Sequence, residues 1–290
     1  MTLRTVVRSV SSFAEDKMAN QKSGASRRAF LKGTVPAIAG GLAAMRFPGE
    51  LLAQQRTAAM PAAASVNSVT ALVDESKIWS KEYWAQKGSV KLNMFRKRAV
   101  APQAGQAARP VLILAHGSSL SSRTSYDLKF PGHGEYSLMN KFADWGYDVW
   151  TLDFEGYGRS TSSGSNSDIA SGAQDLKAAV EVISKETGQQ RYHLFGESSG
   201  ALRAGLFAQI APERVNRLVF AATTYTGEGS STLATRAQGL DFYRANNRRP
   251  RDRAMIASIF TRDKDGTSEP GIDAAIAAME LPLGDSVPTG

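Results

Sequence analysis

The chain has 290 residues, of which 42% are hydrophobic and 21% charged, so it holds enough apolar residues for one globular domain with tails and is not globally disordered. Its formal net charge is +8, but residues 1–56 carry nine Lys or Arg against three Asp or Glu; the rest is nearly neutral, and nucleic acid is not an expected partner. The absence of cysteine excludes disulfides, thiolate catalysis and cysteine-based zinc sites.

The first predicted element is a leader. Arg27 and Arg28 lie in a segment, Ser26–Lys32, that resembles the bacterial twin-arginine export signal. The uncharged stretch 33–45 behind it is too short and too weakly apolar to span a bilayer stably. The resemblance implies that the twin-arginine export machinery carries a folded protein to the periplasm or the medium; an ordinary basic helix start is the alternative. Residues 1–64 are therefore assigned to a signal peptide and linker.

Two features of this leader have open alternatives. Met1 places 25 residues before the motif, whereas a start at Met18 gives a more compact leader. Cleavage is expected within the Ala-rich stretch 53–64, where Ala62, Ala63 and Ala64 offer a small-x-small pattern.

From residue 90 the chain alternates short apolar runs with helical patterns, which predicts an α/β fold with a mainly parallel, doubly wound sheet. The alternation of Val90, Leu92 and Met94 predicts a strand over 90–98, and the continuous apolar run 111–115 predicts a strand buried on both faces. The next expected elements are a helix over 137–145, a strand over 147–152, a helix over 168–187 capped by Ser167 and ended by Gly188, a strand over 192–195, a helix over 201–210 and a strand over 215–221. Residues 223–290 show helical patterns and no further core strand.

The run Gly196-Glu197-Ser198-Ser199-Gly200 matches G-x-S-x-G between a predicted strand and a predicted helix. A sharp turn there exposes the Ser198 hydroxyl, and the small residues on either side let the turn close. The helix N-terminus places positive partial charge beneath a forming oxyanion. The sequence therefore predicts Ser198 as a nucleophile; the alternative is a Gly/Ser turn without a catalytic role.

Three motifs come in one order: His116-Gly117 after the strand 111–115, the run Asp153–Ser160 after the next strand, and the serine motif. In this order and spacing residues 90–222 resemble the α/β-hydrolase family. The resemblance implies that the backbone N–H groups of Ser118 and Ser199 form an oxyanion hole and that His116 is structural. It also implies a core over 65–222 and a helical cap over 223–290. The catalytic acid and histidine are then expected beyond Gly290, with the sheet incomplete at its C-terminal edge and this chain inactive by itself.

The histidines of the chain do not match the family order of serine, acid and histidine. His116, His133 and His193 all precede Ser198. We expect His193 to be a packed strand residue, and His133, in the loop 118–136, is the remaining alternative for a contact with the pocket. Glu228 is the candidate for an acid placed early in the chain.

The expected function is hydrolysis of an ester, thioester or related acyl bond through an acyl-enzyme on Ser198. Perhydrolase, acyltransferase and C–C bond hydrolase activities remain open, as does a non-catalytic binding protein; epoxide and haloalkane hydrolases generally need an Asp nucleophile. A small molecule with a hydrophobic acyl group is the expected substrate, since a group of apolar side chains suggests an apolar pocket wall: Leu233, Leu240, Phe242, Tyr243, Met255 and Phe260. The alternative is that these side chains pack the cap on itself.

The remaining charged and ligand-type residues give no further site. A basic cluster is expected to be solvated surface, with phosphate or carboxylate binding as the alternative: Arg244, Arg248, Arg249, Arg251 and Arg253. The sequence contains no phosphate loop, dinucleotide fingerprint or metal-ligand cluster, so no cofactor and no metal are expected.

Overall fold

The computed structural model describes residues 71–224, 226–261, 266 and 268–290, which belong to one compact unit. The twin-arginine motif, both alternative starts and the expected cleavage stretch lie outside the described residues. Within the described part, no helix is both long and apolar enough to cross a bilayer.

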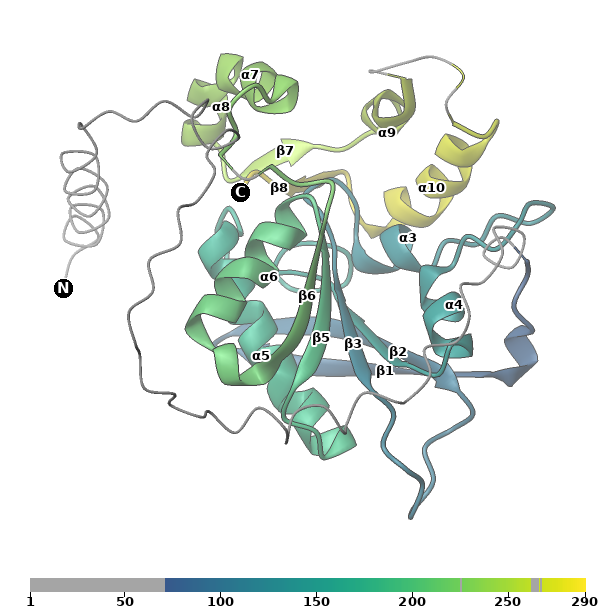
Figure 1. Ribbon diagram of the computed structural model, residues 1–290. Coiled ribbons are helices and arrows are strands. Elements are labelled where there is room, and N and C mark those ends of the chain that lie inside the picture. Colours follow the sequence, from purple (N-terminus) through teal and green to yellow (C-terminus); the bar gives the residue numbers. More distant parts are fainter. Residues whose placement is uncertain (1–70, 225, 262–265, 267) are drawn as a thin grey trace, which may run out of the picture. The chain divides into compact units, whose positions relative to one another are not determined.

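The core is one mixed sheet of six strands in the order β1-β2-β4-β3-β5-β6, which confirms the predicted α/β fold (Figure 1). The first two strands form a hairpin and run antiparallel to each other, and β2 also pairs antiparallel with β4. The pairs β3/β4, β3/β5 and β5/β6 are parallel. The strands are β1 (Ile78–Lys87), β2 (Val90–Ala99), β3 (Val111–Ala115), β4 (Asp148–Leu152), β5 (Tyr192–Glu197) and β6 (Val215–Ala221).

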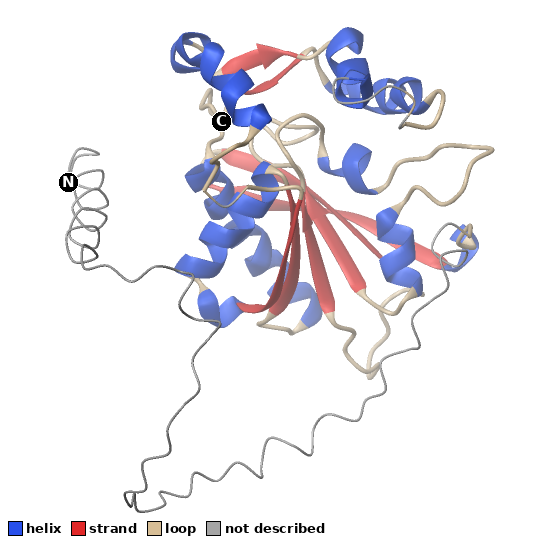
Figure 2. Ribbon diagram, turned by 45° about the horizontal axis from the view of Figure 1, so that its top comes forward, coloured by secondary structure: helices blue, strands red, loops and turns tan. Residues whose placement is uncertain are grey.

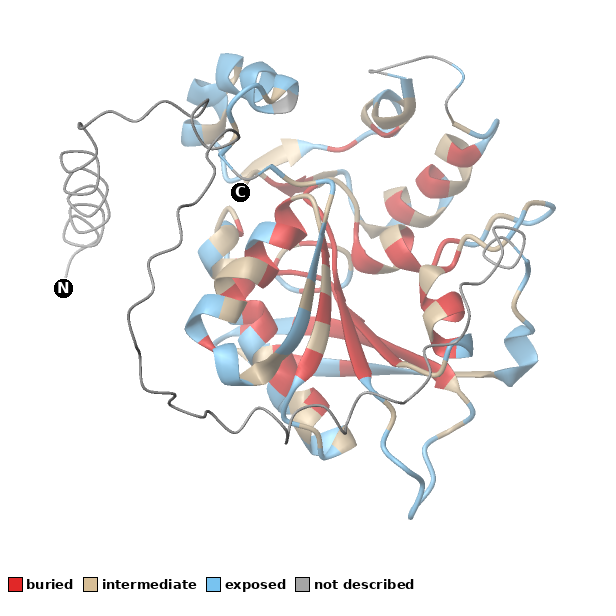
Figure 3. Ribbon diagram, in the orientation of Figure 1, coloured by how far each residue is buried: buried red, intermediate tan, exposed pale blue. Residues whose placement is uncertain are grey.

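Helices cover both faces of this sheet. The helices α5 (Ile169–Thr187) and α6 (Ser199–Ile210) pack on one face, while α4 (Leu138–Asp144) packs on the other (Figure 1). Each face has its own apolar cluster, one around Trp150 and Leu194 and one around Leu114 and Met139. The central strands β3 and β4 are buried along their whole length, as a strand covered on both faces must be (Figure 3).

The segment after residue 222, which we call the C-terminal segment, lies beyond the carboxyl ends of the parallel strands (Figures 1 and 2). Two of its strands form a separate small sheet, and none of its described strands joins the six-stranded one. Its elements are α7 (Ser231–Gln238), α8 (Leu240–Ala245), β7 (Arg248–Pro250), α9 (Arg253–Thr261), α10 (Ile272–Glu280) and β8 (Ser286–Pro288).

The structure corrects one sequence-based expectation and adds two elements that the sequence did not predict. The N-cap of α5 is Asp168, whose carboxylate accepts from the Ser171 N–H, whereas Ser167 has a left-handed backbone (φ 49°). Strand β1 and the short helix α3 (Ser122–Tyr126) were not predicted. Gly188 ends α5 in a left-handed conformation (φ 71°), as predicted. Single 3₁₀ turns complete the fold: η1 (Glu75–Lys77), η2 (Pro212–Arg214) and η3 (Leu281–Leu283).

Candidate active site

Ser198 occupies a tight turn between β5 and α6. Its backbone has φ 54° and ψ −123°, a conformation that costs free energy for any residue with a side chain. The Ser198 N–H donates to the carbonyl of Ala221 (2.9 Å), so the turn is tied to the end of β6. The structure thus has the strand–turn–helix geometry that the serine motif predicts.

The two glycines of the motif are required by close backbone contacts. A Cβ at Gly196 would lie 2.5 Å from the Cα of Ala201, and a Cβ at Gly200 would lie 2.1 Å from the carbonyl oxygen of Ala115. Both distances are far below van der Waals contact, so neither position accepts a side chain without moving backbone. The second contact also presses the start of α6 against the end of β3, which carries the turn at 116–118.

His116 has a structural role in that turn. The ring is buried, and burial lowers its pKa to about 3, with the nearby Arg203 charge adding to the effect. Its Nε2 accepts from the Phe154 N–H (3.1 Å), so the neutral ring carries its proton on Nδ1, which donates to the Gly117 carbonyl (2.6 Å). Because C=O and N–H point in opposite directions across a trans peptide, this bond fixes the direction of the Ser118 N–H.

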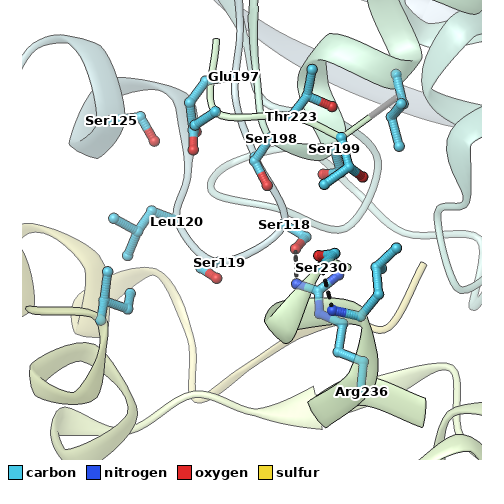
Figure 4. A pocket seen from close by; sticks show the side chains of 16 residues that line it. Ser118, Ser119, Leu120, Ser125, Glu197, Ser198, Ser199, Thr223, Ser230 and Arg236 are labelled. Atoms are coloured by element: carbon cyan, nitrogen blue, oxygen red, sulfur yellow. Dashed lines mark hydrogen bonds between the residues drawn. The ribbon is translucent and has the colours of Figure 1, made fainter. Parts of the chain in front are cut away.

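The turn and the serine elbow line one cavity of about 330 Å³ (Figure 4). A Cβ added at Gly117 would lie 3.2 Å from the Cβ of Ser198, so the two motifs are in contact. Ser118 and Ser199 both line the cavity. Within the described residues, neither of their N–H groups donates to a protein acceptor. Two free N–H groups beside a strained serine match the requirement for an oxyanion hole.

The walls of this cavity are more polar than the sequence suggested. Eight of its sixteen lining residues are Ser or Thr. Of the six apolar side chains expected in the wall, Leu233 lines the cavity and the others do not. Leu240 and Phe242 are exposed, whereas Met255 and Phe260 pack in a separate cluster around Ile256. The expected apolar pocket wall is therefore wrong for five of these six residues.

The basic cluster is also different from the expected solvated surface. The guanidinium of Arg249 donates to the carbonyl of Ser118 (2.8 Å), and that of Arg248 donates to the carbonyls of Ser286 and Gly156. Arg251 is buried and forms an ion pair with a buried carboxylate of α10. These three arginines thus bind groups of the C-terminal segment and of the core. Arg244 and Arg253 are exposed.

Arg236 and Glu197 are site residues that the sequence did not single out. Arg236 of α7 donates to the Ser118 hydroxyl (3.2 Å) and has no carboxylate partner among the described residues (Figure 4). Glu197, the last residue of β5, lines the cavity beside Ser198. Burial raises the pKa of its carboxyl, although the N–H of Gly117 partly offsets the rise. Only their position in the folded chain distinguishes these two from other charged residues.

No histidine among the described residues lines the cavity. His133 stacks on Phe130 and contacts Glu269 in a loop. His193 is a partly buried strand residue near Tyr147, as predicted. Glu228, the candidate acid, is exposed and does not line the cavity. In the described part of the chain, no cluster of His, Asp and Glu is arranged to hold a metal ion.

Comparisons with known proteins agree with this architecture. A 2-hydroxy-6-oxononadienedioate/2-hydroxy-6-oxononatrienedioate hydrolase of Paraburkholderia phymatum is 34% identical over 116 residues, which are 39% of this chain and 36% of the relative. Its namesake in Burkholderia vietnamiensis is 32% identical over 167 residues, 54% of this chain and 52% of the relative. The matches thus span about half or less of each relative.

Solved structures with a similar fold include a carboxylesterase from Bacillus subtilis, with 20% identity and a TM-score of 0.47 over 69% of this chain and 60% of that one. A 2-hydroxy-6-oxo-6-phenylhexa-2,4-dienoate hydrolase from Rhodococcus sp. strain RHA1 has 17% identity and a TM-score of 0.49 over 72% and 67%. Residues 110–270, more than half of the chain, match the family described as the alpha/beta hydrolase fold. The chain therefore belongs to the α/β-hydrolase fold family.

Proposed function

We propose that the protein is a serine hydrolase in which Ser198 attacks the carbonyl of an ester, thioester or related acyl bond. The Oγ atom bonds to the carbonyl carbon, its proton passes to a base, and the N–H groups of Ser118 and Ser199 stabilise the oxyanion. The leaving group departs with a proton, and water then hydrolyses the acyl-enzyme. The observation that carries this proposal is the strained Ser198 turn facing two unbonded N–H groups in one cavity.

We further propose that the base and its acid partner come from polypeptide beyond Gly290, with residues 65–222 as the core and 223–290 as a cap. The exposed edge of the sheet supports this division. On β6, Val219 is 50% and Phe220 55% exposed, and on α6 Ile210 is 48% exposed (Figure 3). Further strands paired with β6 would cover these apolar side chains. We expect the 290-residue chain alone to turn over substrate slowly or not at all.

A second candidate reaction is hydrolysis of a C–C bond in a hydroxy-oxo-dienedioate. It is favoured by the printed names of the two curated relatives and by the polar cavity. Among the described residues the guanidinium of Arg236 has no carboxylate partner, so it suits a substrate carboxylate. Comparing the loss of the dienoate chromophore with release of an aryl alcohol from aryl esters distinguishes the two reactions.

Labelling with a fluorophosphonate tests the central proposal. A protein extended beyond Gly290 should be modified at Ser198, and Ser198→Ala should abolish the label while leaving the fold intact by circular dichroism. Modification elsewhere, or none in a protein extended beyond Gly290, would refute Ser198 as nucleophile. Robust aryl-ester turnover by residues 65–290 alone would refute the need for a further segment.

We also propose that the segment 1–64 directs export by the twin-arginine route to the periplasm or the medium. The Arg27-Arg28 pair in front of an uncharged stretch supports this. Replacing both arginines by lysine should retain the precursor in the cytoplasm of a bacterial host. A periplasmic product that persists in a strain without the twin-arginine machinery would contradict it.

A further inference from the structure

The carboxyl of Glu197 has a position that the elbow itself does not need. The strand β5 alternates, so Glu197 lies on the same face as Phe195, which packs near Tyr126. Among the two residues before Ser198, only Gly196 must be small, because its backbone lies close to α6. At position 197 an apolar side chain would cost less desolvation free energy than a carboxylate. A charge at this partly buried position is therefore stabilised by any hydrogen-bond donor that reaches it.

Within the described residues, the protein itself supplies no cationic partner for this charge. No Lys, Arg or His among them forms an ion pair with Glu197, and the backbone N–H of Gly117 is the group that acts on its carboxyl. The side chain of Glu197 is partly buried and lines the open cavity, as Ser125 does (Figure 4). A carboxylate in this position can accept a hydrogen bond from a molecule that enters the cavity.

The cavity has opposite charges at its two ends. Glu197 and Arg236 lie on opposite sides of Ser198 and Ser118 (Figure 4). A Cβ added at Gly117 would lie 2.9 Å from Glu197 Oε2 and 3.2 Å from Ser198 Cβ, so the carboxyl and the serine flank the same point. A molecule that spans the cavity therefore meets a hydrogen-bond acceptor on one side of Ser198 and a cationic donor on the other.

We propose that Glu197 is a specificity-determining residue that binds a hydrogen-bond-donating substituent, a hydroxyl or an ammonium group, on a substrate whose carboxylate faces Arg236. The inference rests on the proposed function in one respect: the reacting carbonyl is placed at Ser198, between Glu197 and Arg236. It deepens that function by naming the substrate class: polar at both ends, and not an alkyl ester.

Three five-carbon monocarboxylates test this by titration calorimetry at pH 8. Pentanoate has a methyl group at the end where 5-hydroxypentanoate has a hydroxyl and 5-aminopentanoate an ammonium group. The protein should bind at least one of the substituted acids about tenfold more tightly than pentanoate, since a hydrogen bond to a charged group has that strength. A preference for one of them identifies the donor as hydroxyl or ammonium.

Variants assign the preference to Glu197. Glu197→Leu should bind neither substituted acid more tightly than pentanoate, and Glu197→Gln should lose the preference for ammonium but keep part of any preference for hydroxyl. Glu228→Gln, which removes an exposed carboxylate away from the cavity, is the matched control. Circular dichroism melts check that each variant is folded.

Equal binding of the three acids to the unmodified protein, binding of none of them, or a preference that persists in Glu197→Leu overturns the inference. Fluorophosphonate labelling of a protein extended beyond Gly290 separates it from the hydrolase proposal. If the extended protein is labelled at Ser198 but shows no preference among the acids, this inference alone fails. If it shows the preference but is not labelled, this inference holds while the hydrolase proposal fails.

Discussion

At the scale of single residues, His116 makes the stability of the protein depend on pH and also forms the turn 116–118, which orients the Ser118 N–H. In the folded protein its ring stays neutral because burial lowers its pKa to about 3, whereas in the unfolded chain it takes a proton near pH 6.5. Between these values the unfolded state binds more protons, so stability falls as the pH falls. The turn that orients the Ser118 N–H therefore depends on a ring that must remain uncharged.

We expect the free energy of unfolding to decrease by about 1.4 kcal/mol for each pH unit below about 6.5 because of this one residue. Urea titrations at pH 7, 6 and 5 measure the slope, and His116→Asn should remove most of it. His193→Gln is the control, since burial also lowers the pKa of His193 but its ring is only partly buried. A slope unchanged in His116→Asn would show that other groups dominate.

At Gly200 even a methyl group should strongly reduce the stability of the protein. A methyl group there would overlap the carbonyl oxygen of Ala115, at 2.1 Å, and that of His116, at 2.5 Å. We expect Gly200→Ala to lower stability by about 3 kcal/mol or more in thermal or urea unfolding.

The matched control lies in the same helix. A Cβ at Gly205 would approach the ring of Phe220 at 3.2 Å, and that ring is exposed at the sheet edge and free to move. Gly205→Ala should be neutral or stabilising by up to about 1 kcal/mol, because alanine favours helix. Equal losses at both positions would contradict the contact argument.

At the scale of elements, α10 is joined to α3 through a buried carboxylate. Glu280 accepts from the N–H (3.0 Å) and the hydroxyl (2.7 Å) of Ser121, the N-cap residue of α3, and it forms an ion pair with Arg251. Asp153 holds the next residue, Ser122, in the same way. The short helix α3 is thus stabilised by two carboxylates that are distant from it in sequence.

Removal of one member of the ion pair should be costly. Arg251→Met leaves the buried Glu280 without its cation and should reduce stability by about 3 kcal/mol or more. Adding Glu280→Gln should recover part of that loss, because the remaining side chain is then neutral. A double-mutant cycle in urea measures this coupling, and additive single changes would show that the pair is not coupled.

Local patterns explain which elements the sequence predicts. The continuous apolar run of β3 and the short β-rich runs of β4, β5 and β6 predict these strands, and their order places the serine motif at the carboxyl edge. Strand β1 was missed because it is an edge strand with much of its length exposed. Helix α3 was missed because its stabilising carboxylates come from other elements. The same holds for Arg236 and Glu197, whose importance depends on what the fold brings beside them.

At the scale of the whole molecule, β6 is an edge that is open to association. Its apolar side chains are exposed, and among the described residues the strand pairs on one side only, with β5. We expect the 290-residue chain to aggregate with rising concentration, and Val219→Lys to reduce light scattering without loss of stability. Val100→Lys adds the same charge at an equally exposed valine outside the sheet edge and should leave aggregation unchanged. Equal effects of both changes would implicate net charge instead.

The arginines of the C-terminal segment should make this segment more sensitive to guanidinium chloride than to urea. Arg248, Arg249 and Arg251 bind carbonyls and a carboxylate through planar N–H donors. Free guanidinium ion offers the same donors to the same acceptors, whereas urea is uncharged and sodium has no N–H group. Low concentrations of guanidinium chloride should therefore increase the rate of proteolytic cleavage within this segment. Equal concentrations of sodium chloride or urea should leave that rate unchanged.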